Sequence, residues 1–163
     1  MTRPSMKTTL WTLAVVAAMT SLTGCEELEE PTFTNLYDGY FQECKSCHAP
    51  GAPGFEEGKT ESSLNFSSQS SAYNSISTGK AAGLVGNQAD CNGVRFVDGG
   101  ADPAKSLIVA VLDGGVRRAF DLSSTPNCNQ DTISDMTVKV GSSPSSGFVD
   151  DLKEWIEAGA PND

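Results

Sequence analysis

The 163-residue sequence is poor in basic residues, in histidine and in hydrophobic side chains. It holds 11 Lys and Arg against 21 Asp and Glu, so its formal net charge is −10. A chain this acidic repels nucleic acid, which argues against nucleic-acid binding. Hydrophobic residues make up only 38% of the chain, whereas Gly and Pro number 16 and 8. This composition predicts one loop-rich domain whose thin core needs further cohesion.

The sequence also lacks a hydrophobic run of membrane-spanning length. Leu10–Met19 is apolar apart from one threonine, and a helix that short rises about 15 Å, half of a hydrocarbon core. With Arg3 and Lys7 ahead of it, this run predicts a secretory signal peptide over residues 1–24.

Leu22-Thr23-Gly24-Cys25 follows and resembles the lipobox of bacterial lipoproteins. We therefore expect acyl chains on Cys25, which anchor a protein to a membrane outside the cytoplasm. The alternative is an ordinary secretion signal followed by a chance cysteine. Glu26 is not the aspartate of the familiar inner-membrane retention signal, so the outer membrane is favoured, on its periplasmic side or at the cell surface.

Removal of residues 1–24 leaves the chain with still fewer basic residues and methionines. The segment takes away two basic residues and no acidic one, so the net charge of the mature chain becomes −12. It also removes three of the four methionines, which leaves His48 and Met136 as the single histidine and methionine. Residues 25–32 are acidic and predict a solvated tether. Residues 33–163 then form one domain.

Cys44-Lys45-Ser46-Cys47-His48 is a CxxCH motif, the attachment pattern of c-type haem. The thiols of Cys44 and Cys47 would add to the two vinyl groups of the porphyrin. His48, next to the second thiol, would ligate the iron on one face. A backbone carbonyl of Pro50 or Pro53 in the following loop would orient the imidazole.

Three other interpretations of the motif compete. A thioredoxin-type redox CxxC should follow a strand, and nothing upstream of Cys44 has the pattern of one. A zinc site needs four ligands, and no second CxxC or histidine pair lies nearby. A chance CxxCH is possible in any chain, although export to a haem-attaching compartment favours the haem interpretation.

The distal iron ligand is harder to assign. With His48 used, Met136 is the only thioether left, and methionine ligation raises the haem potential and favours electron transfer over catalysis. Met136 could instead be a core residue. The iron would then be five-coordinate, as in peroxidase or sensor chemistry. Lys80 and Lys139 are weaker alternative ligands.

Cys91 and Cys128 remain once the lipid and the haem have taken the other three cysteines. Disulfides persist outside the cytoplasm, so we expect these two to pair. Closing a loop of about 38 residues would stabilise the fold by roughly 3–4 kcal/mol in the chain-entropy model. Two separate buried thiols are the alternative.

Hydrophobic spacing predicts helices around the motif. Phe33–Glu43 leads into it, with Thr34 as N-cap and an apolar stripe that contains Tyr40. Phe148–Ala158 predicts a last helix, capped by Ser145 or Ser146. Its buried face is expected to cross the first helix, with Trp155 near Gly39 and Tyr40.

Two further helices are expected in the middle of the chain. Residues 70–77 predict a short one. Asp102 as N-cap and Pro103 at N1 open another, which ends at Gly114-Gly115. Its apolar positions have the spacing of core residues: Leu107, Ile108, Val111 and Leu112. Leu64 and Phe66 are expected to pack on the haem edge.

Haem propionates need a compensating donor or cation. Arginine offers bidentate contact, and three arginines are candidates: Arg95, Arg117 and Arg118. For each of them a solvated surface position is the alternative.

An N-terminal helix, CxxCH, a loop-rich middle, Met136 and the ending Trp155-Ile156-Glu157-Ala158-Gly159-Ala160-Pro161 together resemble a class I cytochrome c domain. More narrowly, the chain is similar to the cytochrome c-like domain of surface lipoproteins from myxobacteria and planctomycetes. The resemblance covers Phe33 to the C-terminus. The chain departs from the pattern of these domains at Thr137, where they usually have proline.

The resemblance implies a small all-α fold wrapped around one covalent haem c, with thioethers at Cys44 and Cys47 and iron ligands at His48 and Met136. We expect a lipid-anchored monohaem cytochrome that carries single electrons and is not an enzyme. Its charge predicts a redox partner with a basic face. The alternatives are a five-coordinate haem protein with peroxidase or sensor activity, and a haem-free structural lipoprotein.

Overall fold

The structure is a computed structural model that describes residues 31–52, 64–141 and 143–163. The expected signal peptide, Cys25, all but two residues of the tether, and Pro53 lie outside these residues. The described chain is helical, as expected, and apart from one isolated antiparallel bridge between Lys80 and Arg95 it forms no strand pairing. No described helix is both long and apolar enough to cross a bilayer.

The chain leading into CxxCH is one continuous helical stretch. It consists of α1 (Phe33–Leu36), the π-helical turn η1 (Tyr37–Phe41) and α2 (Gln42–Cys44). The predicted N-cap Thr34 is wrong by two residues, because the Thr32 side chain accepts the hydrogen bond from the Asn35 N–H at 3.1 Å. Helix formation begins at Phe33, which is fully buried and so fixes the first turn against the core.

The last helix, α8 (Ser146–Glu157), packs against this stretch and is capped by Ser145. Trp155 lies beside Phe33, with ring centroids 5.3 Å apart. Phe148, rather than Trp155, takes the expected place beside Gly39 and Tyr40, at 5.1 Å from the Tyr40 ring. The sequence pattern identified the buried face of the helix but not which buried residue meets which neighbour.

Helix α4 (Gln69–Thr78) covers the same aromatic cluster from another side and matches the helix predicted over residues 70–77. Ser68 caps it by accepting from the Ser71 N–H at 3.2 Å. Tyr73 packs edge-on against Phe33 with centroids 5.3 Å apart, and its hydroxyl donates to the Ala160 carbonyl. The C-terminal residues are thereby fastened to the first helix.

The single helix predicted from Asp102 to Leu112 is wrong, because Ser106 interrupts it. Ser106 is fully buried; its hydroxyl donates to the Asp102 carbonyl at 2.9 Å and accepts from the Asp98 N–H at 2.8 Å. A serine hydroxyl bonded this way ends one turn and starts another. The observed elements are η3 (Pro103–Lys105) and α5 (Leu107–Leu112).

The predicted helix end at Gly114-Gly115 is also wrong, because a new helix, α6 (Gly114–Ala119), begins there. Asp113 caps it by accepting from the N–H groups of Gly115 and Val116 at 2.7 and 3.3 Å. A side-chain cap of this kind outweighs the poor helix propensity of the two glycines.

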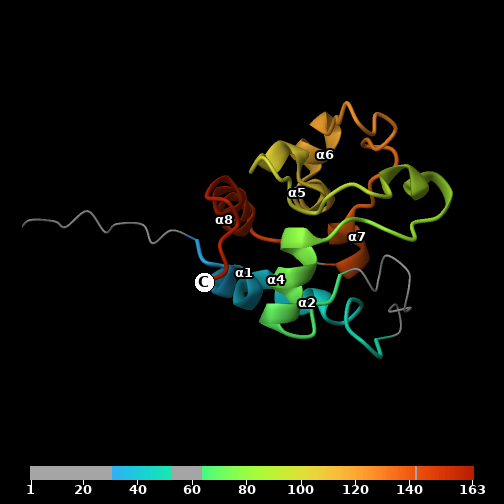
Figure 1. Ribbon diagram of the computed structural model, residues 1–163. Coiled ribbons are helices and arrows are strands. Elements are labelled where there is room, and N and C mark those ends of the chain that lie inside the picture. The colour runs from blue at the N-terminus through green and yellow to red at the C-terminus, as the bar shows by residue number, and fades with distance from the viewer. Residues whose placement is uncertain (1–30, 53–63, 142) are drawn as a thin grey trace, which may run out of the picture.

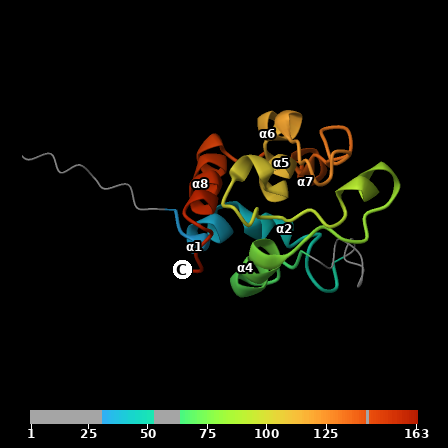
Figure 2. The same cartoon turned by 45° about the horizontal axis from the view of Figure 1, so that its top comes forward.

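The remaining elements of the described residues are η2 (Gly86–Cys91) and α7 (Met136–Val140). The sulfur atoms of Cys91 and Cys128 lie 2.06 Å apart, so the expected pair is at disulfide distance. Figures 1 and 2 show α5, α6 and α7 gathered in one half of the molecule and α1, α2 and α4 in the other, while α8 packs against both α1 and α5.

Candidate functional site

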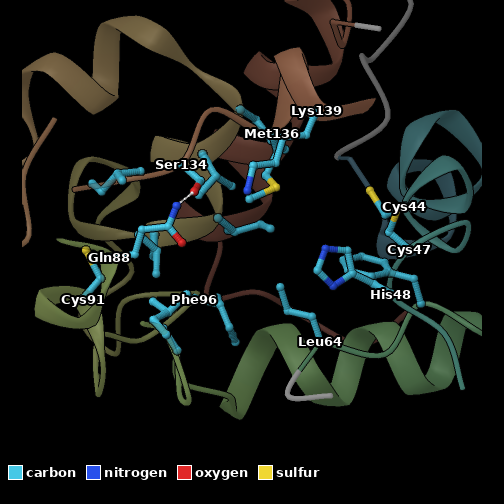
Figure 3. A pocket seen from close by; sticks show the side chains of 18 of the residues that line it. Cys44, Cys47, His48, Leu64, Gln88, Cys91, Phe96, Ser134, Met136 and Lys139 are labelled. Atoms are coloured by element: carbon cyan, nitrogen blue, oxygen red, sulfur yellow. Dashed lines mark hydrogen bonds between the residues drawn. The ribbon is translucent and has the colours of Figure 1, made fainter. Parts of the chain in front are cut away.

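A cavity of about 260 Å³ lies between the two halves. Its volume is close to the lower end of the ~300–1,000 Å³ typical of cofactor sites. Four residues singled out from the sequence line it together: Cys44, Cys47, His48 and Met136. Figure 3 shows them around one space, with His48 and the Met136 thioether pointing into it from different sides.

The two thiols sit where the first helix ends. Cys44 is the last residue of α2, and the following turn is held by hydrogen bonds from the N–H groups of Cys47 and His48 to the Cys44 carbonyl at 3.1 and 2.8 Å. This turn presents both sulfur atoms at one end of the cavity. Cys44 is half-buried and Cys47 is exposed.

Burial, together with the nearby Glu43 carboxylate, raises the pKa of the Cys44 thiol to about 12. A thiolate-based redox CxxC works with a lowered cysteine pKa, so this environment does not fit a thioredoxin-type site. A zinc site finds no support either, since the described residues contain no cluster of three or more His, Cys, Asp or Glu able to hold a metal ion.

The imidazole of His48 is held against the cavity wall by Phe66. The two rings meet edge-on, with centroids 5.9 Å apart, and the Phe66 N–H donates to the His48 carbonyl at 2.6 Å. Phe66 in turn packs on Phe41, which anchors it to the first helix. Leu64 and Phe66, expected from the sequence to pack on a cofactor, both line the cavity.

Met136 begins α7, 88 residues after His48, and is partly buried against the core. Of the two alternative lysine ligands, Lys139 lines the cavity, whereas Lys80 is not among the described lining residues. The structure thus brings His48 and Met136, the candidate proximal and distal ligands, to the same cavity. Their positions in the sequence alone did not predict this.

One wall of the cavity comes from α5, which the sequence assigned only to the core. All four of its predicted core residues face the cavity as well: Leu107, Ile108, Val111 and Leu112. Helical spacing shows which face is apolar but not whether that face meets protein or a ligand. No signal in the sequence distinguished these two roles.

A polar pair was missed. Gln88 of η2 donates a hydrogen bond to the Ser134 hydroxyl, and both residues line the cavity. Figure 3 shows them on the side away from Cys44 and Cys47. A glutamine and a serine in loop-rich sequence carry no pattern that would have identified them.

The three candidate arginines are elsewhere, since none is among the described lining residues. Arg95 donates to the carbonyls of Val97 and Ser77, and Arg118 is exposed. Arg117 forms an ion pair with Asp135. The hydrogen bond from the Thr137 hydroxyl, together with the charge of Arg117, holds the pKa of Asp135 below its ordinary value of 3.8.

Comparison with known proteins adds no assignment: no family model, curated protein or solved structure matches this chain.

Proposed function

We propose that this protein is a lipid-anchored monohaem c-type cytochrome that carries single electrons outside the cytoplasm. The observation that supports it best is the convergence of Cys44, Cys47, His48 and Met136 on one cavity. Two thiols at one end could bond to the vinyl groups, and an imidazole nitrogen and a thioether sulfur are the axial ligands that c-type cytochromes use.

The rest of the cavity fits the same cofactor. Its wall is largely aliphatic and aromatic, as the porphyrin faces require, and would keep water away from a bound haem. When bound, the haem would accept and release one electron; the protein would supply attachment, ligands and a low dielectric. Phe66 would hold the His48 imidazole in the orientation needed for ligation.

The polar side of the cavity fits the two carboxylates that haem carries on the edge away from its vinyl groups. With the vinyl edge at Cys44 and Cys47, those carboxylates would reach Gln88 and Ser134. Lys139, the one lysine or arginine among the described lining residues, lies beside Met136 (Figure 3). Gln88 and Ser134 would take the place of the arginines expected from the sequence.

We propose a carrier rather than an enzyme, because a methionine on the iron leaves no open coordination position for a substrate. Acyl chains on Cys25 would keep the domain at a membrane, with the outer membrane favoured. Its partner would be a redox protein with a basic face, attracted by the net charge of −12 that remains after signal cleavage.

A covalent haem stain of the full-length chain on a denaturing gel tests the cofactor. We expect the wild type to stain and the double variant C44A/C47A to lose the stain. Ser46→Ala is a matched control, since Ser46 lies between the two cysteines and lines the same cavity but has no thiol. An unstained wild type would leave only the haem-free structural lipoprotein.

Met136→Leu tests the distal ligand, because leucine keeps the volume and removes the sulfur. We expect the sulfur-to-iron charge-transfer band of the ferric protein to disappear and the reduction potential to fall. If neither changes, and the wild type binds cyanide and imidazole as readily as the variant, the iron is five-coordinate and peroxidase or sensor chemistry becomes the better assignment.

Cys25→Ala tests the anchor. Membrane fractionation should find the wild type with membranes and the variant in the soluble periplasmic fraction, both stained for haem. Retention of the variant at the membrane would contradict lipidation and leave the haem assignment intact.

A further inference from the structure

Met136 lies inside a small hydrogen-bonded ring. Asp135, the N-cap of α7, accepts from the Thr137 N–H at 3.0 Å and from the Thr137 hydroxyl at 2.6 Å, both through Oδ1. Met136 is the residue between them, so the two bonds restrict its backbone directly. An ordinary N-cap makes only the first type of bond.

Arg117 fastens this ring to the cavity wall. Its guanidinium pairs with the other carboxylate oxygen of Asp135 at 2.5 Å, and Nη1 donates to the carbonyls of Ala110 and Val111 at 3.3 and 3.4 Å. Ala110 and Val111 belong to α5, so one side chain links α5, α6 and α7. The Arg117 side chain is only 15% exposed, which shields these charge-assisted bonds from water.

We propose that Arg117, Asp135 and Thr137 are positioning residues that hold the thioether of Met136 on the haem iron. The proposal rests on the proposed function. The three residues do not touch the iron; they fix the start of α7, and with it the place from which the Met136 side chain enters the cavity.

This role gives a physical reason for Thr137 at a position where the domains it resembles usually have proline. Proline restricts its own backbone covalently, but it has no N–H and no hydroxyl to donate to Asp135. Here the restriction comes from the side chains of Asp135 and Arg117 instead. The departure from the pattern is therefore compatible with a methionine ligand.

The test measures how easily imidazole displaces the thioether in the haem-loaded full-length protein. In Arg117→Ala we expect imidazole to bind the ferric protein about tenfold more tightly, equivalent to about 1.4 kcal/mol, with a weaker sulfur-to-iron charge-transfer band. Arg118→Ala is the matched control: it removes the same charge from the same helix, but Arg118 is exposed. It should leave both measurements unchanged.

Further variants separate positioning from general stability. Asp135→Asn should raise the imidazole affinity about as much as Arg117→Ala does. The double variant should raise it little further, because both substitutions break the same Arg117–Asp135 ion pair. Arg117→Lys should restore part of the wild-type resistance to imidazole binding. Thr137→Val, which removes only the hydroxyl, should raise the imidazole affinity less than Arg117→Ala does. In a Met136→Leu background Arg117→Ala should no longer change imidazole affinity, since no thioether remains to be displaced.

A wild type that stains for haem while Arg117→Ala and Thr137→Val bind imidazole like the control overturns this inference and leaves the proposed function standing. The inference is also overturned if Arg117→Ala changes the imidazole affinity equally with and without Met136, because Arg117 would then support only the fold. A wild type without covalent haem overturns both.

Discussion

The two halves of this molecule are held together by different means. In the aromatic half, formed by α1, η1, α2, α4 and α8, the largest side chains contact one another directly, with Trp155, Phe33 and Phe41 fully buried. In the cavity half, formed by η2, α5, α6 and α7, many of the apolar side chains line the cavity instead. There the Cys91–Cys128 pair and the Arg117–Asp135 ion pair add cohesion.

On the proposed function, we predict that the aromatic half is stable by its own packing, whereas the stability of the cavity half depends on bound haem. An apolar wall that faces a void loses the dispersion contacts on one side. A ligand that binds only the folded state recovers them and stabilises that half.

On the proposed function, loss of haem should have the largest effect. The variant C44A/C47A, which cannot attach haem, should be less stable than the haem-loaded protein by about 4 kcal/mol or more, the stabilisation given by a ligand at 1,000 times its Kd. Amide hydrogen exchange should accelerate far more in α5 than in α8. Equal acceleration in both helices would contradict the division into two halves.

Trp155→Ala should cost about 3–5 kcal/mol, because it empties the centre of the aromatic half and removes the hydrogen bond from Nε1 to the Pro161 carbonyl at 2.9 Å. Urea denaturation measures it, and the loss should be similar with and without haem. Ile108→Ala, in the cavity wall, should cost much less without haem than with it. Val138→Ala, at a side chain 76% exposed, is the neutral control, within about 0.5 kcal/mol.

Removal of the Cys91–Cys128 pair should cost roughly 3–4 kcal/mol, since the open chain gains entropy when unfolded. The double variant C91A/C128A should unfold at lower urea, and a reducing agent should shift the wild type towards it while leaving the variant unchanged. If reductant shifts both proteins alike, the pair is not the bond being broken.

Asp113 joins the two halves, because it caps α6 and accepts a hydrogen bond from Lys153 of α8 at 2.7 Å. The Lys153 ammonium, with the N–H groups of Gly115 and Val116, holds the pKa of Asp113 below its ordinary value of 3.8. A lowered pKa stabilises the fold above the ordinary value, and this contribution is lost as pH falls through the folded-state pKa.

Asp113→Asn should therefore lower the free energy of unfolding by about 1 kcal/mol at neutral pH. The difference between this variant and the wild type should shrink at pH values well below the ordinary carboxyl pKa. Thermal melts at several pH values measure this. A difference that stays constant with pH would mean that the charge of Asp113 does not matter.

The smallest effect concerns the partner. Because exposed charges are screened beyond about 10 Å at 0.1 M salt, electron transfer to a basic partner should slow as salt increases. Stopped-flow rates with a basic and an acidic small redox protein check this, and the acidic one should show the opposite trend. Rates independent of ionic strength with both would contradict electrostatic steering.

Local signals in the sequence predicted the elements well where one interaction dominates. The apolar face of α8 and the helix over 70–77 were confirmed. Cys91 and Cys128, paired in the prediction because the other cysteines were assigned elsewhere, lie at disulfide distance. Prediction failed where a buried polar side chain overrides the local pattern, as Ser106 does by dividing the expected helix. It also failed for the helix cap at Thr34, because burial of Phe33 sets where α1 begins.

The sequence by itself determined which chemistry is available: one CxxCH motif, one histidine and, after the expected cleavage of residues 1–24, one methionine. These follow from residue identity and spacing alone. Only the tertiary structure decided that Met136 shares a cavity with His48, that α5 lines it, and that Arg117 pairs with Asp135 instead of lining the cavity. Contacts between residues tens of positions apart depend on how helices pack, and helical spacing shows which face of a helix is buried but not which residues that face meets.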